Sequence, residues 1–186
     1  MTSVPEGGDA PWIEEPPRVD GPISLVEYDP AWPVTFEAGA ARIRSALGRT
    51  AALIEHAGST AVPGLAAKPI IDIVLGVPNS TDEGAYVPPL EAVGYRLVIR
   101  EPGWYEHRLL KGTDPAVNVH VFSIGCEEIE AMLRFRDRLR HHPGDLELYL
   151  RTKRQLAART WTYVQDYADA KSEVIREIRE RALSGG

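Results

Sequence analysis

The chain has 186 residues, a formal net charge of −6, and a composition that is 44% hydrophobic and 26% charged. This length suits a single domain with one buried core. The acidic balance argues against general attraction to nucleic acid or to an anionic membrane. The single cysteine, Cys126, excludes an intramolecular disulfide and a cysteine-rich zinc site. We expect a cytoplasmic protein, because the sequence shows neither a signal-peptide pattern nor an apolar stretch of membrane-spanning length.

The N-terminal part of the chain changes character near residue 20. Residues 1–20 are rich in Pro, Gly and Glu, which predicts a flexible leader in front of a single domain over 21–186. The apolar run at 23–27 predicts a short strand or extended segment. Apolar residues at helical spacing then predict a helix over 32–47, which Gly48 ends.

The middle of the chain alternates short apolar runs with turn residues, and its end is helical in character. Residues 51–56 predict a strand, and the β-branched run at 68–77 predicts the central strand of a sheet. The later pattern predicts a helix at 88–93, strands at 95–99, 105–110 and 117–122, and helices at 126–139 and from 146 to about 183, with a break near Thr160. One mixed sheet followed by helices predicts an α+β fold.

The segment from His56 to Asp72 carries the strongest functional signal. Gly58, Ser59 and Thr60 form a small-residue turn, whose backbone N–H groups and hydroxyls can hold a phosphate. Asp72 stands among Ile, Val and Leu, where a carboxylate is costly unless a metal ion or a basic side chain pairs with it. The alternative is a capping serine and an aspartate that is hydrogen-bonded at a strand end.

This segment resembles the GrpB family, which carries the same pattern of His-x-Gly-Ser-Thr-x-Val-Pro-Gly-Leu-x-x-Lys-Pro-x-x-Asp-Ile. The likeness continues through the motifs that begin at Val26, Gly103 and Val119, and it covers about residues 23–180. The family is similar to the nucleotidyltransferase superfamily. The resemblance therefore implies a nucleotidyltransferase-like mixed β-sheet with flanking helices and a C-terminal helical segment. It also implies a nucleotide or a phosphorylated small molecule as substrate.

The chain departs from the superfamily pattern at one important point. Such enzymes place two acidic residues on one face of the strand after the Gly-Ser turn, where they hold magnesium. Here the same-face neighbours of Asp72 are Ile70 and Val74, and the third acidic position is taken by His120. Asp72 and His120 remain the candidate ligands for a divalent metal, Mg²⁺ or Mn²⁺, with Zn²⁺ as an alternative.

Neighbouring strands supply further candidates for catalysis. Strand alternation puts Glu106 and Arg108 on one face and His107 on the other. We expect Asp72, His120 and either Glu106 or His107 to converge as catalytic residues, for metal binding or for general acid-base chemistry. Arg108 is a candidate for substrate binding. The alternative is that His107 faces solvent and His120 is an ordinary half-buried histidine.

Other residues are candidates for binding the substrate or its phosphate. His56 precedes the turn and could orient Asp72, contact substrate, or only satisfy a carbonyl group. Lys68 could neutralise a phosphate, or it could be an ordinary surface lysine. Tyr163 and Lys171 recur at helical spacing in the last helix, which predicts an aromatic and basic face for an anionic ligand, or simple packing.

These residues lead to three hypotheses. The first is a nucleotidyltransferase-like enzyme acting on a nucleotide or a phosphorylated small molecule, with an acceptor that the sequence does not identify. The second is a non-catalytic module that binds such a ligand, and the third is a metal-assisted ligase or hydrolase on the same fold. In each case we expect a small-molecule or nucleotide partner, with neither nucleic acid nor membrane involved. The sequence does not indicate an oligomeric state.

Overall fold

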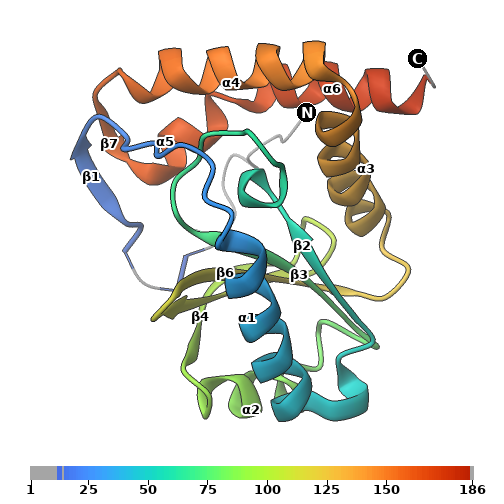
Figure 1. Cartoon of the computed structure of the whole chain (residues 1–186). Coiled ribbons are helices and arrows are strands. Elements are labelled where there is room, and N and C mark those ends of the chain that lie inside the picture. Colours follow the sequence, from blue (N-terminus) through green and yellow to red (C-terminus); the bar gives the residue numbers. More distant parts are fainter. Residues whose placement is uncertain (1–11, 14, 185–186) are drawn as a thin grey trace.

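A computed structural model describes residues 12, 13 and 15–184, and a five-stranded sheet forms its centre (Figure 1). The strands are, in spatial order, β2 (Leu53–Ala57), β3 (Ile71–Val77), β6 (Ala116–Ser123), β5 (His107–Thr113) and β4 (Tyr95–Glu101). β3 and β6 run parallel, whereas the other neighbouring pairs run antiparallel. The sheet is therefore mixed, and helices flank it, so the predicted α+β class is confirmed.

Helices lie on both sides of this sheet (Figure 1). The main core lies between one sheet face and two helices, α1 (Trp32–Leu47) and α2 (Val87–Glu91). The other helices are α3 (Glu127–His141), α4 (Pro143–Ala157), α5 (Val164–Asp169) and α6 (Ser172–Leu183), and short 3₁₀ turns occur at Gly48–Thr50 (η1), Ser59–Ala61 (η2) and Glu83–Ala85 (η3). Helices α4 and α6 form a layer across the top of the view in Figure 1.

The sequence of β3 determines which of its side chains reach the core. Ile71, Ile73 and Leu75 are buried in the cluster that α1 covers, and each contributes roughly 1.5–3 kcal/mol by burial. Because side chains alternate along a strand, Asp72 and Val74 point to the opposite face. There Val74 packs in a second cluster with residues of α3, and Asp72 faces the C-terminal helical part of the molecule.

The structure refines the prediction for the region around residue 20. The segment predicted as a short strand or extended segment at 23–27 forms a single bridge, between Val26 and Ala67. The strand of this region is β1 (Arg18–Gly21), which begins within the predicted leader. Earlier in the leader, the Ile13 N–H donates to the Val98 carbonyl at 3.0 Å. Residues 1–11 and 14 of the predicted leader lie outside the described residues.

The predicted final helix is also divided. After α4 the chain forms a three-residue strand, β7 (Trp161–Tyr163), which pairs with β1 in an antiparallel arrangement. Aromatic and β-branched residues, here Trp161, Thr162 and Tyr163, favour extended backbone over helix. The chain then returns to helix in α5 and α6. As a result, Lys171 lies between two helices and not within one.

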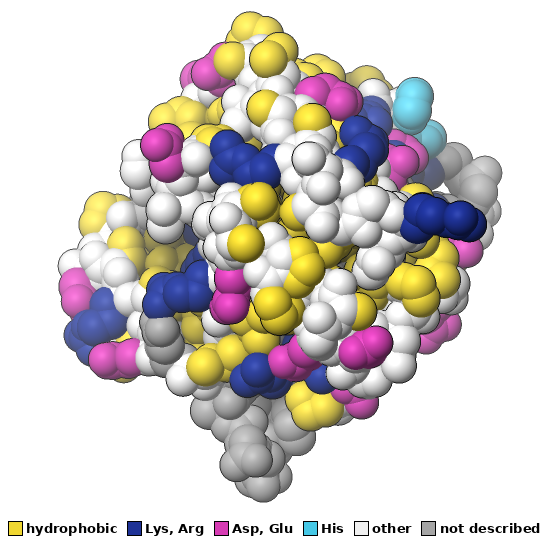
Figure 2. All heavy atoms as spheres, turned by 90° about the horizontal axis from the view of Figure 1, so that it is seen from below, with side chains coloured by type: hydrophobic (Ala, Val, Ile, Leu, Met, Phe, Trp, Pro, Cys, Tyr) yellow, Lys and Arg dark blue, Asp and Glu magenta, His cyan; other side chains and the backbone are white. Residues whose placement is uncertain are grey.

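The surface carries charges of both signs. On the face seen from below in Figure 2, basic and acidic side chains are interspersed with hydrophobic ones. None of the helices that the structure describes has the length and apolar character needed to span a bilayer.

Candidate functional site

A small cavity of about 80 Å³ opens where the sheet meets the C-terminal helices. It is lined by the turn after β2, the segment before β3, the ends of β3 and β6, and residues of the helical layer. The lining residues are Leu25, Ser59, Thr60, Lys68, Ile70, Asp72, Asn118, Lys153, Tyr167 and Lys171. The structure thus brings together five of the residues predicted from the sequence, and adds others that were not predicted.

Asp72 is the acidic group of this cavity. Its Oδ1 accepts a hydrogen bond from Asn118 Nδ2 at 2.9 Å and lies 3.6 Å from His120 Nε2. Burial on its own would raise the pKa of Asp72. The interaction with His120, the hydrogen bond from Asn118 and the positive charge of Lys171 outweigh it, so the pKa of Asp72 lies below the ordinary value. Asp72 is therefore a carboxylate at neutral pH.

His120 connects Asp72 to a line of side chains across three strands. Its Nδ1 lies 3.1 Å from His107 Nε2, and His107 Nδ1 lies 2.6 Å from Glu101 Oε2. Glu101 ends β4 and is paired in register with His107 at the start of β5. The order Glu101–His107–His120–Asp72 therefore runs from the far edge of the sheet to the cavity.

The protonation of this line follows from its partners. His107 is only 3% exposed, and burial lowers its pKa to about 4, so it is neutral at pH 7. A carboxylate only accepts hydrogen bonds, so His107 donates Nδ1–H to Glu101 and accepts at Nε2 from His120 Nδ1–H. This assignment leaves Nε2 of His120 facing the Asp72 carboxylate.

Gly58 is required where the turn approaches Asp72. A Cβ atom on Gly58 would lie 2.3 Å from Asp72 Oδ2, and its φ of +66° lies in the region that favours glycine. The next two residues, Ser59 and Thr60, line the cavity. The turn that was predicted as a phosphate cradle therefore also packs directly against the carboxylate.

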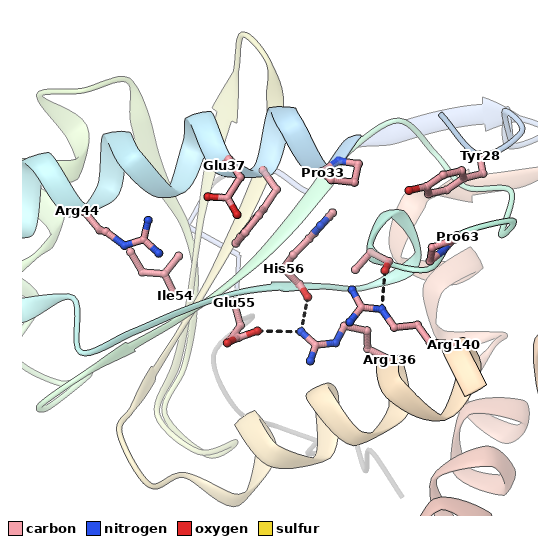
Figure 3. Close-up of a pocket in the computed structure, with 12 residues that line it drawn as sticks. Tyr28, Pro33, Glu37, Arg44, Ile54, Glu55, His56, Pro63, Arg136 and Arg140 are labelled. Atoms are coloured by element: carbon pink, nitrogen blue, oxygen red, sulfur yellow. Dashed lines mark hydrogen bonds and ion pairs between the residues drawn. The ribbon is translucent and has the colours of Figure 1, made fainter. Parts of the chain in front are cut away.

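His56 lies outside the small cavity. It lines a separate cavity of about 630 Å³ between α1, β2 and α3 (Figure 3). Its ring stacks on that of Phe36, with 4.7 Å between the ring centres. Its Nε2 lies 3.0 Å from Thr60 Oγ1, so it reaches the small cavity only through Thr60. Burial lowers the pKa of His56 to about 4, so it is neutral. Arg136 also lines this larger cavity, and its Nη1 donates a hydrogen bond to the His56 carbonyl at 2.9 Å.

Two predicted residues of β5 and the turn before it lie apart from the cavity. Glu106 precedes the strand with a φ of +51°. Arg108 is buried and donates to Glu83 at 2.6 Å and to Glu106 at 3.3 Å. Strand alternation places Arg108 on the face opposite His107. Of the two expected alternatives, the structure therefore brings His107, and not Glu106, next to His120.

Tyr163 and Lys171, predicted on one helical face, are separated by the break in the last helix. Tyr163 lies in β7, where Arg18 stacks over its ring at 5.3 Å, and it does not line the cavity. Lys171 does line it, with Nζ 4.6 Å from the centre of the Tyr167 ring.

The sequence analysis missed three residues of this site. Asn118 donates a hydrogen bond to the Asp72 carboxylate, Glu101 accepts one from His107, and Lys153 of α4 lines the cavity. Lys153 is 2% exposed and donates from Nζ to the Ala66 carbonyl at 2.6 Å. Only four of the 21 Lys and Arg residues of the chain are lysines, and three of those four line this cavity.

The residues present fit a divalent metal poorly. Asp72 and His120 supply two donor groups 3.6 Å apart, and the described part of the chain holds no group of three His, Cys, Asp or Glu suited to a metal ion. Mg²⁺ and Mn²⁺ prefer several oxygen ligands. Here Lys68, Lys153 and Lys171 line the same cavity as the carboxylate and would repel a cation.

Comparison with known proteins identifies the family. The model of the family described as GrpB protein matches residues 22–181. The chain belongs to the GrpB family. It is 59% identical to a UPF0157 protein of Halalkalibacterium halodurans over 160 residues, which are 86% of this chain and 82% of the relative. The crystal structure of GrpB from Enterococcus faecalis is 32% identical and has a TM-score of 0.73, over 87% of this chain and 98% of that one. The GrpB resemblance and its fold are thus confirmed.

A different kind of relative is a dephospho-CoA kinase of Mycolicibacterium paratuberculosis. It is 29% identical over 187 residues, which cover 87% of this chain but only 46% of that protein. This GrpB-family chain therefore corresponds to about half of the kinase.

Proposed function

We propose that this GrpB-family chain is a nucleotidyltransferase-like enzyme that acts on a nucleotide or a phosphorylated small molecule. The observation that carries the proposal is the line Glu101–His107–His120–Asp72, which ends in a cavity lined by lysines and hydroxyls. Perturbed titratable groups that converge on a cavity are typical of catalytic sites. The similarity to half of a dephospho-CoA kinase agrees with a substrate that carries phosphoryl groups.

In this proposal one set of cavity residues binds the phosphoryl group and another acts on the acceptor. Ser59, Thr60 and the lysines hold the phosphoryl oxygens, and Asp72 faces the acceptor. The acceptor oxygen forms a bond to phosphorus while the bond from phosphorus to the leaving oxygen breaks. The proton of the acceptor hydroxyl passes to Asp72, and His120 stabilises the charge that develops. No step is assigned to a metal, because the donor groups fit one poorly.

Turnover and binding with nucleoside triphosphates test this proposal. Calorimetry with ATP, CTP, GTP and UTP should show binding of at least one, and pyrophosphate release should be measurable when small hydroxyl acceptors are added. Asp72→Asn should reduce release by roughly 10²–10⁴-fold, the usual contribution of a general base. Glu106→Gln is the matched control, since Glu106 lies outside the cavity.

The outcomes separate an enzyme from a binding module. Turnover that is unchanged in Asp72→Asn contradicts the proposed role of this residue. Binding of a nucleotide without turnover under any acceptor favours a non-catalytic binding module. Absence of nucleotide binding contradicts a nucleotide as the substrate.

A further inference from the structure

We propose that Lys68, Lys153 and Lys171 form a binding site for a single phosphoryl group that needs no divalent metal ion. This inference rests on the proposed function and specifies the part of the substrate that the cavity holds. In the superfamily pattern, metal ions held by paired carboxylates neutralise the charge of the phosphate. Here we assign that neutralisation to the ammonium groups of the lysines.

The placement of lysine in the chain is the first argument. The chain uses arginine for most of its basic residues, and its four lysines are Lys68, Lys111, Lys153 and Lys171. Three of them reach one cavity from three separate segments: the loop before β3, helix α4, and the link between α5 and α6. No arginine is among the lining residues of this cavity. A small ammonium group fits such a space better than a planar guanidinium and serves as a point charge for phosphate.

The environment of Lys153 is the second argument. Its ammonium is nearly completely buried, and one N–H is used by the Ala66 carbonyl at 2.6 Å. The face of the Tyr149 ring lies 5.4 Å away and stabilises the positive charge. An ammonium has three donors, so this lysine keeps donors for a ligand in the cavity. Burial lowers the pKa of Lys153 to about 7, so a bound anion would favour the charged form of its amine.

The balance of charge in the cavity is the third argument. Among the described residues that line the cavity, three lysines accompany one carboxylate, that of Asp72. Burial lowers the pKa of Lys153 and of Lys68, and the positive charge of Lys171 lowers both further. An anion relieves this repulsion between positive charges, whereas a divalent cation would increase it.

The size of the cavity limits what it can hold. Its volume of about 80 Å³ is well below the roughly 300–1,000 Å³ of pockets that enclose a whole drug-sized ligand. This space accommodates one tetrahedral phosphoryl group but not a nucleoside. The remainder of the substrate must therefore lie at the mouth of the cavity.

Binding of inorganic phosphate to the full chain tests the inference. Calorimetry is done once with excess EDTA and once with Mg²⁺, with sulfate and acetate as comparison anions. We expect phosphate to bind equally well under both conditions, and acetate to bind more weakly. Lys153→Met and Lys171→Met should each weaken phosphate binding by about tenfold or more, as expected for loss of a charge-assisted hydrogen bond.

Lys111→Met is the matched control. Lys111 lies on β5 and stacks on Trp12 at 5.0 Å, outside the lining of the cavity, so its removal should leave the affinity within about threefold. Circular dichroism checks that each variant folds. Because Lys171 lies in a link between helices, its variant keeps the test valid even if the Lys153 variant is unstable.

The results distinguish this inference from the proposed function. Phosphate binding that requires Mg²⁺ overturns the inference but leaves nucleotide turnover possible. An equal loss in Lys111→Met and Lys171→Met also overturns it, since a general surface charge would then explain the binding. Absence of phosphate binding under every condition overturns the inference, and the turnover assay with nucleotides then decides the proposed function separately.

Discussion

The contact between Gly58 and Asp72 gives the sharpest prediction on the architecture of the site. In Gly58→Ala, the new Cβ would lie 2.3 Å from Asp72 Oδ2, at a backbone conformation with φ +66° and ψ −166°. This backbone region costs a non-glycine residue about 1–3 kcal/mol. Forcing the carboxylate away from the turn adds about 1–3 kcal/mol, as overpacking does. The free energy of unfolding should therefore fall by about 2–6 kcal/mol.

Two variants separate the strain from the clash. Gly64 has a φ of +81° and no atom within 4 Å of its hypothetical Cβ, so Gly64→Ala carries strain alone, about 1–2 kcal/mol. In the Asp72→Ala background the carboxylate is absent, and Gly58→Ala should lose the clash contribution of about 1–3 kcal/mol. Urea denaturation of the four members of this double-mutant cycle measures the coupling. Equal costs for Gly58→Ala with and without the Asp72 side chain would refute the claim that the turn packs on the carboxylate.

Two other predictions concern the histidines. Glu101→Gln replaces a group that only accepts hydrogen bonds by an amide that can also donate, so the tautomer of His107 is no longer fixed. ¹⁵N NMR should then show mixed tautomers of His107 and His120, and turnover should fall by roughly tenfold; Glu106→Gln should change neither. Acid should destabilise the fold, because His56 and His107 have folded pKa values of about 4. The unfolded state takes up these protons near pH 6.5. The free energy of unfolding therefore keeps the full contribution of each histidine above that pH, and falls by up to about 3 kcal/mol per histidine towards pH 4. Urea midpoints measured across this range should shift less in His107→Gln; an unchanged shift would contradict the burial argument.

The sequence predicts those parts of the fold that local pattern determines. Helix α1 has apolar residues at helical spacing and ends at Gly48, whose φ of +52° favours glycine, so its bounds of 32–47 were predicted correctly. Strand β3 was predicted from its β-branched residues. By contrast, β1 and β7 are short, and each depends on pairing with the other across about 140 residues of chain, which no local pattern reveals.

The same distinction applies to the candidate site. Asp72 was predicted because a carboxylate in an apolar strand is locally conspicuous. The choice between Glu106 and His107 depended on which of them lies on the same sheet face as His120 and the cavity. Only the register between β5 and β6 decides this. Lys153 and Asn118 lie 81 and 46 residues from Asp72 in sequence, and nothing near them in the chain marks their approach to it.

The packing around Val74 excludes a second carboxylate beside Asp72 on this face of β3. Val74 lies on the same face of β3 as Asp72, but it is fully buried, in a cluster with Ala57, Phe122 and Ile129. A carboxylate there would be removed from water among apolar side chains, at a cost of several kcal/mol. The apolar packing of α3 against the sheet thus leaves Asp72 as the one acidic side chain on this face of β3. The polar groups that other segments place near it are the amide of Asn118, the imidazole of His120 and the lysines that line the cavity, so the surroundings of this acid favour an anionic ligand over a cation.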